Sequence, residues 1–125
     1  MNTLQKHMIR GCLTPEIECD LPGRLRLGFR KYKLLPPEAL PYLHYVKDVL
    51  DMPGGVTDVQ LNPRIGTALI LYDPSVTSAQ RIMKWIGIVT DVGLELAGEQ
   101  SWQPCDGGRI EQLMRNRLKA FLPLN

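Results

Sequence analysis

The chain has 125 residues, which is enough for one small domain with short extensions. Its hydrophobic content of 44% and charged content of 22% are ordinary for a folded protein and argue against a disordered chain. The net charge of +2 is too small to indicate nucleic-acid binding, and no apolar run reaches the roughly 18 residues that a membrane span needs. The first residues lack the apolar region of a secretory signal, and the three cysteines are odd in number, so we expect a cytoplasmic protein with reduced thiols.

Two segments near the N-terminus alternate apolar and polar residues with the period of a strand. They cover residues 16–21 and 24–29, and they follow an extension at 1–14 that is predicted to be irregular. Pro22-Gly23 separates them and predicts a bulge, which would join both halves into one long bent strand. In the second half, the side chains that should face the core are Leu25, Leu27 and Phe29. The side chains of Arg24 and Arg26 should face the opposite side.

The next part of the chain predicts a helix followed by a hairpin. Proline suits a first helical turn, so the helix should begin near Pro41 and end at Pro53. Strands are predicted at 56–61 and 67–72, and the turn between them needs Gly66 at positive φ.

A second helix and a fourth strand complete the pattern. Apolar residues at helical spacing predict the helix, which would pack against the sheet through Ala79, Ile82, Met83 and Ile86. The alternation at 92–97 predicts the last strand. The order strand–helix–strand–strand–helix–strand predicts an α+β protein, a ferredoxin-like βαββαβ sandwich over residues 15–98.

The C-terminal part reads as a linker at 99–107 and an amphipathic helix at 108–122. One face of this helix is apolar and carries Ile110, Leu113, Met114, Leu118 and Phe121. The other face is largely basic. A bare ferredoxin-like sheet exposes one face, so we expect the helix to cover that face in the same chain or in a second copy. Docking on another partner or on a membrane surface stays open.

Three stretches carry a resemblance to a known family. They are Pro22-Gly23-Arg24-Leu25-Arg26-Leu27-Gly28-Phe29, the segment from Met52 to Pro63 and the segment from Gly66 to Asp73. Together they resemble the heavy-metal-associated (HMA-like) domain family, in particular its second branch, which usually lacks the metal-binding cysteine pair. The resemblance implies a ferredoxin-like fold and a protein-interaction or regulatory role in metal handling. A metal-transporting ATPase or a second copy of the chain would be the partner.

The loop that binds metal in other family members corresponds to residues 30–40 here. It contains no Cys, His or Met and carries three positive charges, which repel a cation. Copper(I) and zinc carriers need thiolates, so we expect no metal at this loop and no cofactor.

An alternative metal chaperone would combine Cys12 and Cys19 with His7 or Met8. The six-residue interval between the cysteines is not a common zinc spacing. Cys19 on an inward face beside the neighbouring apolar residues would simply be a small core residue, and we favour that interpretation.

A basic surface is the main candidate for partner binding, and it comprises Arg24, Arg26, Arg30, Lys31 and Lys33. It could bind an acidic protein, anionic lipid or nucleic acid. The strands lack exposed aromatics that would stack on bases, which disfavours nucleic acid. Pairing of the arginines with Asp58 or Glu95 is the structural alternative. No nucleophile–base pair, phosphate-binding loop or paired-carboxylate motif is present, so we do not expect an enzyme.

Overall fold

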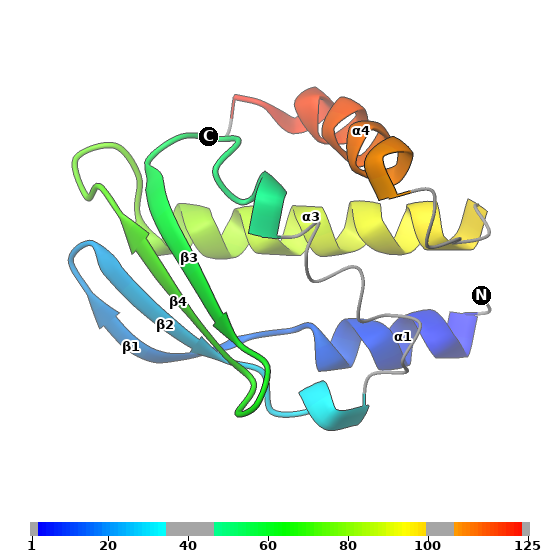
Figure 1. The fold of residues 1–125 in the computed structure, drawn as a ribbon, viewed down its shortest axis with the longest axis horizontal. Coiled ribbons are helices and arrows are strands. Elements are labelled where there is room, and N and C mark those ends of the chain that lie inside the picture. The colour runs from blue at the N-terminus through cyan, green and yellow to red at the C-terminus, as the bar shows by residue number, and fades with distance from the viewer. Residues whose placement is uncertain (1–2, 35–46, 100–106, 124–125) are drawn as a thin grey trace.

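A computed structural model of the chain describes residues 3–34, 47–99 and 107–123. The protein is α+β, with one four-stranded antiparallel sheet in the order β1-β2-β4-β3 (Figure 1). The elements in chain order are α1 (Thr3–Cys12), β1 (Glu16–Leu21), β2 (Arg24–Gly28), the 3-10 helix η1 (Tyr32–Leu34), β3 (Val56–Asn62), β4 (Thr67–Tyr72), α3 (Ala79–Glu99), α4 (Gly107–Leu118) and the 3-10 helix η4 (Lys119–Phe121).

The first predicted strand is in fact a hairpin. Leu21 pairs with Arg24, so Pro22-Gly23 forms a tight turn between β1 and β2 and does not continue one bent strand. Gly23 has a φ of 81°, the conformation that a glycine supplies after proline in such a turn. The bulge lies further back, where the register shifts between Ile17 and Cys19. Every residue of β1 is exposed, as expected of a short edge strand.

The hairpin between β3 and β4 agrees with the sequence prediction. Gly66 has a φ of 68°, and its N–H donates to the Asn62 carbonyl at 2.9 Å. Tyr32 packs its ring against the position that a Cβ on Gly66 would occupy, and its hydroxyl donates to the Arg64 carbonyl. Glycine is therefore required here for backbone conformation and for space.

The fourth strand predicted at 92–97 is wrong, because these residues belong to α3. The buried positions Ile82, Ile86, Val89, Val92 and Leu96 continue one helical stripe along this helix. In a βαββαβ sandwich the last strand pairs beside the first. Here β1 occupies that edge next to β2, so residues 92–97 are free to extend the helix.

The helix predicted from Pro41 falls mostly outside the described residues. Only its last turn is described, with helical conformation at 47–49. Trp85 of α3 is 1% exposed, and its Nε1 donates to the Val49 carbonyl at 2.9 Å. This bond fixes the end of the turn against α3 and satisfies a buried carbonyl.

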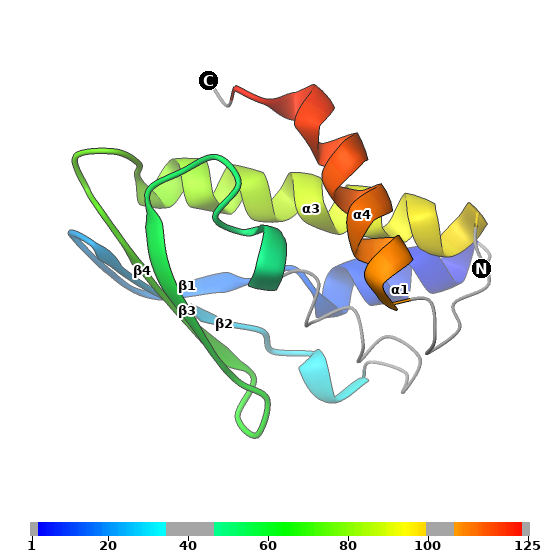
Figure 2. The same ribbon diagram turned by 45° about the horizontal axis from the view of Figure 1, so that its top comes forward.

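The main core lies between one face of the sheet and α3 (Figures 1 and 2). Leu27 and Ile82 both belong to this core, at 0% and 5% exposure, as the sequence predicts. The N-terminal extension is not irregular: it forms α1, which runs beside α3 and buries Ile9 and Cys12. Among the described helices, none combines the length and the apolarity of a transmembrane helix.

Candidate functional site: the open face of the sheet

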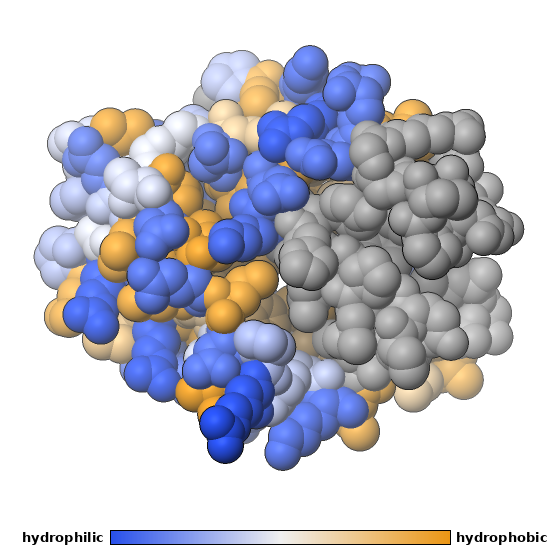
Figure 3. Space-filling model, in the orientation of Figure 1, coloured by the Kyte–Doolittle hydropathy of each residue, from blue (hydrophilic) through white to orange (hydrophobic). Residues whose placement is uncertain are grey.

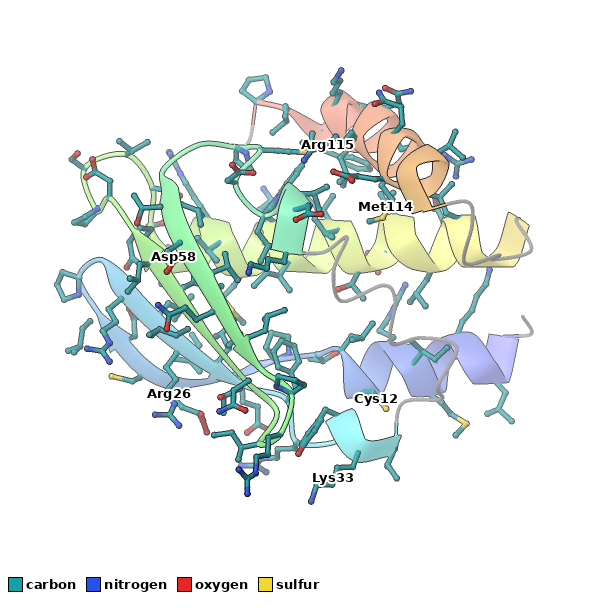
Figure 4. All side chains as sticks on the ribbon, in the orientation of Figure 1. Cys12, Arg26, Lys33, Asp58, Met114 and Arg115 are labelled. Atoms are coloured by element: carbon teal, nitrogen blue, oxygen red, sulfur yellow. The ribbon has the colours of Figure 1, made fainter. Side chains whose placement is uncertain are left out.

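The C-terminal helix does not cover the open face of the sheet, contrary to the sequence expectation. Helix α4 packs on α3 in the helical layer (Figures 1 and 2), where Met114 and Leu118 are fully buried in the main core. Figure 4 shows Met114 pointing into the space between α4 and α3. Of the other residues predicted on its apolar face, Leu113 packs on the core, Phe121 is 48% exposed and the Ile110 side chain lies outside the described set.

Two arginines of α4 make polar contacts within the helix and with neighbouring segments. The Arg115 guanidinium pairs with Glu111 at 3.2 Å and donates to the Asp48 carbonyl at 2.9 Å. Arg117 lies 3.8 Å from Glu95 of α3. Glu95, considered above as a partner for the sheet arginines, is therefore engaged in the helical layer.

The open face is the face of the sheet that none of the described helices covers, and it carries two rows of side chains across β2, β4 and β3. Alternation along the strands assigns its members, because their neighbours in sequence are buried against α3. One row is Arg24–Leu71–Asp58 and the other is Arg26–Leu69–Gln60. On the left of Figure 3, over the strands, hydrophobic and hydrophilic residues are intermingled.

Charge on the open face is divided between its two sides. Arg24 and Arg26 are exposed on β2, and Asp58 is exposed on β3 (Figure 4 labels Arg26 and Asp58). The half-buried Leu69 and Leu71 of β4 lie between them. Two strand spacings separate Arg24 from Asp58, about 10 Å. The described residues contain no ion pair between either arginine and Asp58, the pairing that the sequence left open.

Acidic residues of β1 neutralise part of the predicted basic surface. Glu18 accepts from Arg26 Nε at 3.2 Å, and Glu16 lies 2.7 Å from Arg30. Both ion pairs are largely exposed and contribute little stability. They do reduce the net positive charge around Arg26 and Arg30. Among the described residues of the open face, Arg24 is the arginine that has no ion pair.

Lys31 and Lys33, also predicted in the basic surface, lie on the segment after β2 and are exposed. Figure 4 shows Lys33 away from the labelled Arg26. Lys33 therefore does not share one compact patch with Arg26. The remainder of the predicted loop, 35–40, lies outside the described residues.

The alternative metal site is not assembled. Cys12 is buried at the end of α1, while Cys19 is exposed on β1 opposite Arg26. Figure 4 shows Cys12 far from Arg26 across the molecule. His7 and Met8 are exposed on α1. No group of three or more His, Cys, Asp or Glu side chains within the described ranges could hold a metal ion. The expectation that Cys19 is a core residue is also wrong, because the bulge at Glu18 turns it to the open face with Arg26.

A hollow of about 330 Å³ lies at the end of the sheet beside the open face, between the start of β1 and the turn after β3. It is lined by Glu16, Glu18, Arg30 and Tyr32 among others. The Glu16–Arg30 pair and the Glu18–Arg26 pair already use the charged groups on this lining.

Asp73 closes β4 with a local turn that orders the start of the next segment. Its carboxylate accepts from the Ser75 hydroxyl at 2.6 Å and from the Ser75 N–H at 2.9 Å. The hydroxyl bond first and the backbone bond second lower the pKa of this carboxyl below its ordinary value of 3.8. The pKa shift thus has a structural cause and requires no ligand.

No protein-family model, curated protein or solved structure was found to match the chain.

Sequence reasoning missed Glu18 and Gln60 as residues that shape the open face, and it considered Asp58 only as a pairing partner of the arginines. The signal for Glu18 was present, since a Pro-Gly pair flanked by two alternating segments also predicts a hairpin. A hairpin would have placed the acids of 16–20 beside the arginines of β2. The opposition of Asp58 to Arg24 depends on β4 lying between β2 and β3, which the local pattern does not encode.

Proposed function

We propose that this chain is a non-enzymatic interaction domain that docks a protein partner on the open face of its sheet. The observation that carries the proposal is the exposure of the rows Arg24–Leu71–Asp58 and Arg26–Leu69–Gln60 on the side away from α3. An apolar centre with a polar rim is the arrangement of many protein–protein interfaces.

The resemblance of residues 22–29, 52–63 and 66–73 to HMA-like domains supports a regulatory role in a metal-handling context. It also supports the finer assignment to the ferredoxin-like fold, with β1 in the edge position that the last strand of a βαββαβ sandwich holds. In this proposal the domain works in the cytoplasm, and its partner is a metal-transporting ATPase rather than a metal ion.

Leu71 is central to the docking argument. It is half-buried on β4, a strand that is paired on both sides, and its neighbours in the same row are charged. A central strand is rigid, so its side chains are held in place before binding and lose little conformational freedom. Replacing Leu71 by lysine should disturb docking much more than folding, because its side chain faces away from α3.

Titration calorimetry of the purified chain with the soluble domain of a metal-transporting ATPase from the same organism tests the proposal. We expect Leu71→Lys to weaken binding by about tenfold or more, since one poorly placed central residue costs more than about 1.4 kcal/mol. Arg81→Asp, on α3, is the control for a changed surface charge away from the open face. Binding that is equal for the wild-type and Leu71→Lys proteins, or absent for the wild-type protein, would contradict the proposal.

A further inference from the structure

The charges on the open face are complementary to a second copy of the same face, but only in one orientation. Arg24 on β2 and Asp58 on β3 occupy the same row at equal strand spacing on either side of Leu71. Rotation by 180° about an axis along β4, with the two open faces together, exchanges the β2 side with the β3 side. Arg24 of each copy then lies opposite Asp58 of the other.

We propose that the open face binds a second copy of this chain, with the two-fold axis parallel to β4. This inference rests on the proposed function of the open face as a docking surface, and it assigns a second copy to that face when no other partner is bound. Leu69 and Leu71 lie on the strand of the axis, so each meets its own counterpart. The result is an apolar centre flanked by two identical Arg24–Asp58 ion pairs, the arrangement that an isologous dimer requires.

The other two-fold axis in the plane of the sheet, perpendicular to the strands, is disfavoured by charge. It would place β2 of one copy on β2 of the other, with Arg24 facing Arg26. Like charges placed opposite each other across an interface are costly and suppress that arrangement. The position of the charges therefore selects one dimer of the two.

The groups involved can make these contacts. Packed sheets lie about 10 Å apart with strands nearly aligned, a gap that an arginine and an aspartate side chain span together. Asp58 already accepts from the Val59 N–H at 2.9 Å and from the Gln60 amide at 3.0 Å. A carboxylate has about four acceptor positions, so it can still accept from a guanidinium. Arg24 has no ion pair among the described residues, so no intramolecular partner must be displaced.

The area of the open face limits the expected affinity of self-association. Three strands at about 4.8 Å spacing, with β1 at the rim, form a face that is small by the standards of permanent dimers. We therefore expect reversible association with a dissociation constant of about 1–100 μM. A heterologous partner would compete for the same face, so its binding should dissociate the dimer.

Sedimentation velocity over a concentration series, combined with charge-swapped variants, tests the axis. Arg24→Asp alone and Asp58→Arg alone each place like charges in both pairs, and each should weaken self-association by about tenfold or more. An equimolar mixture of the two variants restores both pairs, one of them with exchanged sign and the other as in the wild-type dimer. We expect a heterodimer whose dissociation constant is within about threefold of the wild-type value. Arg81→Asp on α3 is the matched control and should self-associate like the wild-type protein.

Asp58→Arg also loses the hydrogen bond to Val59, so a denaturant melt must first show that it is folded. Leu71→Lys provides a second variant, because it places two lysines together at the axis and should abolish the dimer. A wild-type protein that stays monomeric at about 500 μM would overturn the inference. So would a dimer that survives Leu71→Lys, or folded charge variants that fail to associate when mixed. A monomeric wild-type protein that still binds the ATPase domain through Leu71 would overturn only the dimer and leave the proposed function standing.

Discussion

Replacing Leu118 by alanine should strongly destabilise the protein, although this residue is only a few positions from the C-terminus. Its side chain is 0% exposed and packs in the main core with Met114 and residues of α3. Full burial of a leucine is worth about 1.5–3 kcal/mol, and an unfilled cavity adds to the loss. Alanine is a good helix former, so helix propensity adds little to this cost.

We expect the free energy of unfolding to fall by about 2–4 kcal/mol, below the largest core losses because a peripheral helix can shift to fill part of the cavity. With an ordinary denaturant dependence, the urea midpoint should decrease by about 1–2 M. Equilibrium urea melts followed by Trp fluorescence and by circular dichroism measure this change. Coincident transitions would show that α4 unfolds together with the sheet.

Phe121→Ala provides the comparison, because Phe121 lies just after α4 but is 48% exposed. This variant should lose about 1 kcal/mol or less. If Leu118→Ala lost less than about 0.5 kcal/mol, or no more than Phe121→Ala, α4 would not be part of the core and the reasoning would be refuted. The C-terminal helix would then be a free element available for a partner.

Three further changes test local features. Gly66→Ala should cost more than about 1 kcal/mol in urea melts, because it strains a positive φ and collides with the Tyr32 ring; a neutral result would mean that the turn has another conformation. Trp85→Phe leaves the buried Val49 carbonyl without its donor and should cost about 1–3 kcal/mol, whereas an unchanged melting midpoint would show that this bond is not formed. Asp73 has a lowered pKa in the folded protein, so its charge stabilises above about pH 4 and this contribution is lost as the pH falls through the folded pKa. The stability difference between wild type and Asp73→Asn should therefore shrink as the pH falls below the ordinary pKa of 3.8 and through the lower folded pKa, and a constant difference would contradict the assignment.

Local sequence patterns predicted those elements whose burial is one-sided. The alternation in β2 placed Leu25 and Leu27 in the core and the arginines outside, because a strand has two faces and only one of them is buried. The turn at Gly66 was predicted because positive φ is a local property of glycine. The amphipathic spacing of α4 correctly identified Met114 and Leu118 as the buried side of a helix.

Local patterns alone were therefore enough to predict the α+β class, the apolar face of most elements and the turn at Gly66. Long-range packing was needed to establish that residues 92–97 are helical, since alternate apolar residues there fit both a strand and the continued stripe of α3. It also decided that β1 is the edge strand and that α4 packs on α3. The open face depends on the same long-range choices: Arg24 and Asp58 are 34 positions apart and share a row only because β4 lies between β2 and β3. Periodicity states which side of an element is apolar, but the neighbour that buries this side is selected by competition among all the apolar faces of the chain.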